Sequence, residues 1–239
     1  MSVSGTYSFS VTANDICLSA LRGLHVYGPT DTVPATDITY MMQALNIVVK
    51  SLAAKGVMVW TMQDLAVPTV ANQATYYIGP TGPDLITPSR PMRILDAYMR
   101  SPTNNDVQIK IVSRFDYDLL GIKNQTGVPN QMIYDPQFPN GIVTLYNVPA
   151  DNTYTLHIIA QRQLMDFNAT TDNPDFPQES YQMLKWLLMD EVALEYEASA
   201  LTIKIVAAKA LQYQKENTDF EQEEVSMTFA PSSRIGQGA

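Results

Sequence analysis

The chain has 239 residues, of which 46% are hydrophobic and only 16% are charged, and its formal net charge at pH 7 is −9. This length and composition predict a globular protein with one large domain or two smaller ones. The 15 lysines and arginines are scattered without forming a run, which argues against a groove that grips a phosphate backbone. The single cysteine, Cys17, excludes an intramolecular disulfide, and we expect it to be a small buried apolar residue.

Two helices are predicted near the N-terminus. Thr12 is followed three positions later by Asp15, a variant of the capping box, and the helix that starts there ends before Gly28. The second helix is expected to begin at an N-cap Thr36 and to end at Gly56 as its C′ glycine. Apolar residues recur at helical spacing along both segments, so each helix should bury one face.

The hydrophobic pattern changes after Gly56 from the helical period to alternation. Short apolar segments separated by Pro, Gly and Asn follow, and residues 113–123 are predicted to form one short helical turn. The regular spacing of these segments predicts a small antiparallel sandwich or barrel. The expected strands are residues 57–60, 65–70, 74–79, 93–99, 106–113, 131–135, 142–146 and 153–161.

Two further helices are predicted near the C-terminus. Pro174 and Pro177 make a rigid extended entry, which a helix could not tolerate in its interior. Helices are then expected over residues 178–199 and 201–217. Residues 225–239 combine Gly, Ser and Pro with isolated apolar residues, which is typical either of a disordered terminus or of an arm that becomes ordered on a partner.

Helices at both ends of a β-rich middle predict an α+β protein. We expect the N- and C-terminal segments to form one helical bundle, with an antiparallel β-sandwich or barrel domain inserted between them. The expected boundaries are residues 1–56 and 167–224 for the helical domain, 57–166 for the β domain, and 225–239 for an extended C-terminal arm. The N-terminal residues lack the features of a secretory signal, and no apolar run approaches the roughly 20 residues of a membrane span, so we expect a cytoplasmic site of synthesis and no membrane partner.

No pattern in the chain predicts catalysis. His25 and His157 are the only histidines, and neither has a Cys, Asp or Glu at metal-ligand spacing, so we expect structural roles for both. Asp116 and Asp118 flank a tyrosine in a predicted turn, where we expect them to cap that turn. Phosphate-loop, nucleophile-elbow and zinc-protease motifs do not occur in the sequence. We therefore expect a protein with no cofactor, no metal and no enzymatic activity.

Several short segments, taken in order over roughly residues 12–216, carry a resemblance to a known family. The chain resembles the head-to-tail adaptor proteins of short-tailed double-stranded DNA phages, which are also called tail accessory factors, packaged-DNA stabilisation proteins or head-completion proteins. Its middle is similar to that of the longer members, which have a β insertion. The segments that carry the resemblance are residues 14–23, 36–60, 113–117, 127–129, 174–177 and 184–187.

The resemblance implies a structural virion protein at the head–tail junction, assembled in the host cytoplasm. It implies a ring, typically of about twelve copies, beneath the portal protein, which extends and seals the DNA channel and offers a platform for the tail. The implied partners are the portal, tail nozzle or tube proteins, fibre proteins, and double-stranded DNA that passes through the lumen without specific binding. The residues expected to dock the C-terminal arm on the portal are Met227, Phe229, Arg234 and Ile235, and those expected in the ring interface or the bundle core are Leu21, Met41, Leu45, Leu184, Leu188 and Val192.

Three other functions are open from the sequence. One is a tail tube or nozzle component, stacked one step further from the head. The second is a β-sandwich module that binds a receptor or a glycan, with the helices as its oligomerisation stalk, and the third is a hydrolase, which only generic carboxylates favour. The tyrosines that a glycan site would use as stacking rings are Tyr76, Tyr77, Tyr134, Tyr146 and Tyr154.

Overall fold

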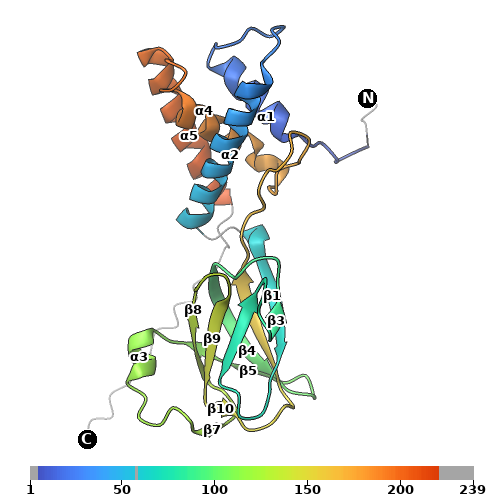
Figure 1. Ribbon diagram of the computed structural model, residues 1–239, viewed down its shortest axis with the longest axis vertical. Coiled ribbons are helices and arrows are strands. Elements are labelled where there is room, and N and C mark those ends of the chain that lie inside the picture. Colours follow the sequence, from blue (N-terminus) through green and yellow to red (C-terminus); the bar gives the residue numbers. More distant parts are fainter. Residues whose placement is uncertain (1–4, 57–58, 221–239) are drawn as a thin grey trace, which may run out of the picture.

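The computed structural model describes residues 5–56 and 59–220, and these form a mixed α+β protein, as predicted. The helices are α1 (Ala13–Gly23), α2 (Ala35–Lys55), α3 (Arg114–Asp118), α4 (Tyr181–Val192) and α5 (Ala200–Phe220). The strands are β1 (Met62–Pro68), β2 (Thr75–Gly79), β3 (Leu85–Ile86), β4 (Arg93–Arg100), β5 (Asp106–Gln108), β6 (Lys110–Ile111), β7 (Thr126–Gly127), β8 (Gln131–Asp135), β9 (Gly141–Tyr146), β10 (Val148–Pro149) and β11 (Thr155–Gln161). Helices α1, α2, α4 and α5 lie at one end of an elongated chain, and the strands, together with the short helix α3, lie at the other (Figure 1). None of the helices in the described ranges has the length and apolar character needed to cross a bilayer.

The two N-terminal helices begin in different ways. Helix α1 has the predicted capping box, because the hydroxyl of Thr12 accepts the backbone N–H of Asp15 and the Asp15 carboxylate accepts the backbone N–H of Thr12. Helix α2 begins earlier than predicted, at Ala35, since the carbonyl of Pro34 accepts the first intrahelical bond from Ile38. The predicted N-cap at Thr36 is therefore wrong, and Thr36 lies within the first turn.

The predicted role of Gly56 and the predicted length of the helix at residues 178–199 also need correction. Gly56 follows α2 with an extended backbone, φ −159° and ψ 177°, and so is not a left-handed C′ glycine. The predicted helix 178–199 is shorter, because a 3-10 turn occupies residues 178–180 and α4 ends at Val192. The chain then turns, and the hydroxyl of Ser199 accepts the backbone N–H of Thr202 at the start of α5.

Helices α1, α2, α4 and α5 make one helical part with a shared interior. Helix α4 packs against α1, α2 and α5, which places it at the centre of this part (Figure 1). Leu21 from α1, Leu45 from α2, Leu188 from α4 and Val206 from α5 belong to the same buried cluster. Segments from the two ends of the chain thus remove one continuous apolar surface from water.

The strands make a second part with its own buried cluster. The four-stranded sheet has the order β1-β11-β4-β5, the five-stranded sheet has the order β3-β2-β9-β8-β6, and β10 pairs with β7. Leu156 and Ile158 of the first sheet share a cluster with Val143 and Leu145 of the second, so the inner faces of the two large sheets meet. The pairs β2–β3, β6–β8 and β7–β10 are parallel, which corrects the expectation of a wholly antiparallel arrangement.

Two predicted strands take another form. The segment 106–113 divides at Ile109 into β5 and β6, which lie in different sheets. The backbone N–H of Ile109 still bonds to Ala97 of β4, whereas that of Lys110 bonds to Asn130, so the chain crosses between the sheets at this buried residue. Residues 59–61 form a 3-10 turn instead of the predicted strand, and residues 57–58 lie outside the described ranges.

Candidate assembly surfaces

The structure places the six residues predicted for the ring interface or bundle core inside the helical part. Leu21, Met41, Leu45, Leu184, Leu188 and Val192 each have 0% exposed surface. Side chains without exposed surface pack against the same chain and have no area with which to meet a second copy. Contacts between copies would therefore need other residues. The four residues predicted for portal docking, Met227, Phe229, Arg234 and Ile235, lie outside the described residues.

Helix α5 has apolar residues on two opposite sides. On one side Val206 and Ala210 are buried in the helical part, and Tyr213 stacks on Trp186 of α4 with the ring centroids 6.3 Å apart. About half a turn away around the helix, Leu201, Ile205 and Leu211 are 69%, 50% and 70% exposed. We call this second side, with the exposed Ala208, the α5 outer face. Within residues 5–56 and 59–220, the chain covers only the first of the two apolar sides.

Helix α2 has a long exposed side that is almost free of charge. Tyr40 is 38% exposed and Ile47 is 59% exposed on this side. The one charged residue beside them, Lys50, has its Nζ 2.5 Å from a carboxylate oxygen of Asp166 and donates to the carbonyl of Leu164 at 2.7 Å. We define the α2 outer face as the exposed residues Thr36, Tyr40, Gln43, Ile47, Ser51 and Ala54.

A third exposed apolar surface lies on the β part, around the short helix α3. The hydroxyl of Ser113 accepts the backbone N–H of Asp116 and so caps α3. The prediction that Asp116 and Asp118 cap this turn is therefore wrong, because Ser113 is the cap and Asp118 pairs with Lys123. The large apolar residues Phe115, Leu119 and Ile122 follow at spacings of four and three and are 72%, 68% and 64% exposed. We call these three residues the α3 surface.

Two ion pairs lie next to the α3 surface. Arg114 lies 2.6 Å from the carboxylate of Asp135, and Lys123 lies 3.2 Å from that of Asp118. The carboxylate of Asp116 accepts the hydroxyl of Ser113 and makes no ion pair among the described residues, so the surface is apolar with one negative charge beside it. A partner would have to match it mainly by shape and apolar contact.

A row of polar side chains crosses the outer side of the four-stranded sheet. The Nδ1 atom of His157 lies 3.0 Å from both carboxylate oxygens of Asp64, and the imidazole stacks on the ring of Tyr98 with the centroids 4.9 Å apart. Arg100 makes two bonds of 2.8 Å to Asp106, and these bonds are the main reason that the pKa of Asp106 lies below its ordinary value. His157 and Tyr98 are directly opposed across β11 and β4, so the row works as a set of cross-strand pairs, which agrees with a structural role for His157.

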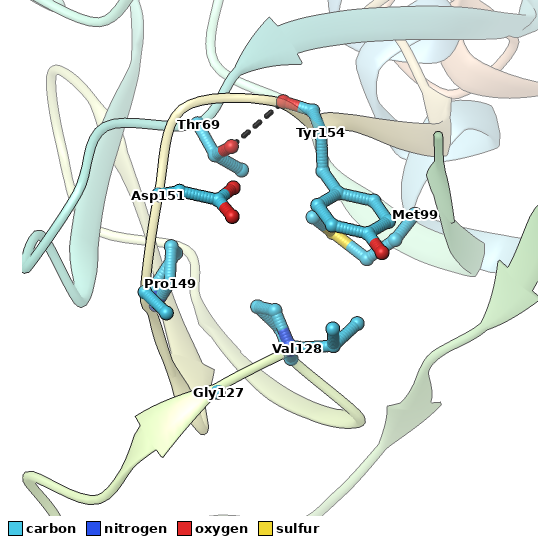
Figure 2. Close-up of a pocket in the computed structure, with 9 residues that line it drawn as sticks. Thr69, Met99, Gly127, Val128, Pro149, Asp151 and Tyr154 are labelled. Atoms are coloured by element: carbon cyan, nitrogen blue, oxygen red, sulfur yellow. Dashed lines mark hydrogen bonds between the residues drawn. The ribbon is translucent and has the colours of Figure 1, made fainter. Parts of the chain in front are cut away.

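One cavity, at the far end of the β part, offers little room for a substrate. It has a volume of about 30 Å³, and Thr69, Met99 and Tyr154 lie on its wall (Figure 2). The hydroxyl of Thr69 donates to the carbonyl of Tyr154 at 2.7 Å. Such a volume holds one or two water molecules. Within residues 5–56 and 59–220 no group of three or more His, Cys, Asp or Glu side chains is placed to hold a metal ion.

A larger hollow lies where the helical part meets the β part. Its volume is about 440 Å³, and its wall includes Lys50, Gln63, Arg162 and Asp166. The charged groups in it already have partners, since Lys50 pairs with Asp166 and Arg162 pairs with Asp175. This hollow is a polar joint between the two parts.

No protein-family model and no curated protein matches this chain. The function proposed below therefore depends on the fold and the exposed surfaces of the chain itself.

The five tyrosines predicted for glycan stacking do not form a common exposed platform. Tyr76 is fully buried and its hydroxyl accepts the backbone N–H of Val70, while Tyr134 donates to the carbonyl of Pro91. Tyr146 and Tyr154 are partly buried, and Tyr77 is 40% exposed. A sugar that stacks on aromatic rings needs exposed ring faces, which this arrangement offers at one tyrosine.

Sequence reasoning missed the α5 outer face and the joint between the two parts. The α5 outer face had a signal, because Leu201, Ile205, Ala208 and Leu211 follow one another at the helical spacings of four, three and three residues beside the inner stripe. The Arg162–Asp175 pair had none, because its partners are 13 residues apart in an irregular segment.

Proposed function

We propose that this protein is a structural, non-enzymatic virion component, a head-to-tail adaptor whose copies form a ring beneath the portal. In this proposal α1, α2, α4 and α5 are a helical bundle that makes the ring wall. The β part is a sandwich that projects from the wall to meet tail or fibre proteins. The ring would extend and seal the DNA channel, and double-stranded DNA would pass through it without specific binding.

One observation carries the proposal: the two ends of the chain share one helical interior. Leu21 and Leu45 lie in the same buried cluster as Leu188 and Val206. This gives each copy a compact helical wedge that can repeat around an axis. The exposed apolar α5 outer face supports the proposal further, because such a surface is typical of contact with another protein.

The charge of the chain fits a passive channel. The formal net charge of −9 and the scattered cations favour repulsion between the wall and DNA phosphates. A lumen that repels phosphate would let the genome move without being held at fixed points.

We expect the purified chain to be monomeric or weakly associated and to form a ring when it is mixed with its portal protein. The reason is that portal copies would hold neighbouring chains at a high effective concentration. Native mass spectrometry of the chain, with and without portal, measures both states. Tight binding of a single copy per portal would contradict the proposal.

A chain shortened to residues 1–224 is the matched control in that experiment. It keeps every described helix and strand and lacks the predicted docking arm, residues 225–239. We expect it to fold with unchanged circular dichroism and to leave the portal unoccupied. Normal docking of the shortened chain would contradict the assignment of the arm.

The α3 surface is where we expect the β part to meet its tail partner. Replacing Phe115 and Leu119 together by serine should weaken binding to the purified tail tube or nozzle protein by about tenfold or more, because two exposed apolar anchors are lost. Titration calorimetry measures this affinity. The control is Val107→Ser, which removes a 44% exposed apolar residue from β5, in the other sheet. An equal loss of affinity in the control would contradict the assignment.

A further inference from the structure

We propose that the α5 outer face of one copy packs on the α2 outer face of the next copy. This inference rests on the proposed function only in requiring that copies assemble. It names the two surfaces that meet, and neither surface contains any of the residues predicted from the sequence for the ring interface.

The α5 outer face has no cover from the part of the chain that the structure describes. Helix α5 packs on α4 and makes no comparable contact with α1 or α2 in the described residues. Leu201, Ile205 and Leu211 remain at least half exposed along about 15 Å of helix. Single exposed apolar residues are common on protein surfaces, whereas an ordered row on one side of a helix marks a contact site.

The α2 outer face has the length and the neutrality to be that cover. Its residues run from Thr36 to Ala54, about 27 Å of helix, which exceeds the apolar length of α5. Tyr40 and Ile47 supply apolar area, and the other members are small or uncharged. The positive charge of Lys50 is neutralised by Asp166. A helix that packs here would therefore meet no unpaired charge among the residues of the α2 outer face.

Charge argues against the alternative in which two α5 helices pack on each other. Lys204 is exposed and lies between Leu201 and Ala208 on the side that such a pair would bury. A two-fold contact between α5 helices would bring the Lys204 side chains of both copies close together, and like charges at a contact are unfavourable. Packing on α2 places Lys204 beside a surface whose cation nearest to Ile47, Lys50, is neutralised by Asp166.

The positions of the two faces also favour a repeating assembly. Helix α4 contacts α5 and the α1–α2 pair, so the α5 and α2 outer faces belong to different sides of the helical part. When copies join through two different faces, the growing assembly still has one free α2 outer face and one free α5 outer face after each copy is added. Such contacts continue until the ring closes, whereas a contact between identical faces ends at a dimer.

The native cysteine allows a clean disulfide test. Cys17 has 0% exposed surface, and its burial raises the pKa of the thiol to about 12, so it should not react with exposed thiols. New cysteines are introduced singly as Ile47→Cys and Ile205→Cys. Each variant, by itself or as an equal mixture of the two, is assembled on the portal protein and then oxidised with copper phenanthroline, and covalent dimers are counted on a non-reducing gel. The parent chain and the exposed Val107→Cys variant are controls.

We expect dimers in the mixture at a yield about tenfold or more above that of either variant alone, and a ladder of larger species from the double variant Ile47→Cys/Ile205→Cys. Dimers of Ile205→Cys alone, at the yield of the mixture, would overturn the proposal in favour of an α5–α5 contact. The proposed contact would also be overturned if every sample gave covalent dimers only at the yield of the Val107→Cys control. If the parent chain still forms rings on its portal in that case, only the assignment of the faces fails. If it forms none, the proposed function fails with it.

Discussion

Replacement of Leu188 by alanine is expected to lower the free energy of unfolding of the helical part by about 3–4 kcal/mol. Leu188 has 0% exposed surface and lies on α4, the helix that contacts α1, α2 and α5. Truncation removes apolar contacts and leaves a cavity where segments from both ends of the chain meet. Urea denaturation followed by circular dichroism at helical wavelengths measures the loss.

The loss should be confined to one part of the molecule. The β part has a separate buried cluster, so amide exchange of β9 and β11 should change much less than that of α1 and α5. Ile205→Ala, which truncates a residue that is 50% exposed, is the matched control and should change stability by about 0.5 kcal/mol or less. A loss below about 1 kcal/mol for Leu188→Ala would show that α4 does not hold the two ends together.

The parts of the fold that the sequence predicted well depend on neighbours close in the chain. The Thr12–Asp15 capping box and the strand Gln131–Asp135 match their predictions because three to five consecutive residues contain the whole signal. The mixed α+β class was also predictable, since the hydrophobic period changes twice along the chain.

The wrong predictions arose where another contact, distant or close in the chain, outweighed the local preference. The alternation over residues 106–113 is typical of one strand, but burial of Ile109 between two sheets divides it. At α2, Thr36 matched a capping preference, yet Pro34 already supplied an extended residue with a free carbonyl. Local preference is a weak guide where another acceptor or another sheet is within reach.

The candidate interface shows the same limit. A buried stripe and an exposed stripe look alike in sequence, because both repeat at helical spacing. Leu188 and Leu201 are both leucines in such stripes, and only packing separates the residue with 0% exposure from the one with 69%. The sequence therefore indicated that helices would pack, but it did not indicate which apolar side would remain for a second copy.

The joint between the two parts should depend strongly on one ion pair. Arg162 binds Asp175 through two bonds of 2.5 and 2.8 Å, and both side chains are about three-quarters buried or more, with 25% and 19% exposed. We expect Arg162→Ala to lower the free energy of unfolding at pH 7 by about 2–3 kcal/mol, because the Asp175 carboxylate would remain partly buried without its cation. Lys123→Ala breaks the exposed pair with Asp118 and should cost about 0.5 kcal/mol or less.

The pH dependence of the stability loss caused by Arg162→Ala distinguishes the loss of a charge interaction from the loss of packing. Burial alone would raise the pKa of Asp175, but the hydrogen bonds from Arg162 and from the backbone of Met165 outweigh it, so the pKa lies below its ordinary value. A lowered pKa contributes stability that is present above the unfolded pKa of about 3.9 and is lost as the pH falls through the folded pKa. In Arg162→Ala the pKa of Asp175 should shift in the opposite direction, because burial without the cation raises it. Protonation of Asp175 at lower pH then removes the buried charge and makes the variant less unstable. Urea denaturation of the parent chain and of Arg162→Ala between pH 7 and about pH 3 measures their free energies of unfolding. The difference between these free energies should become steadily smaller as the pH falls. A difference that stays constant over this range would mean that Arg162 holds the joint through packing of its aliphatic stem.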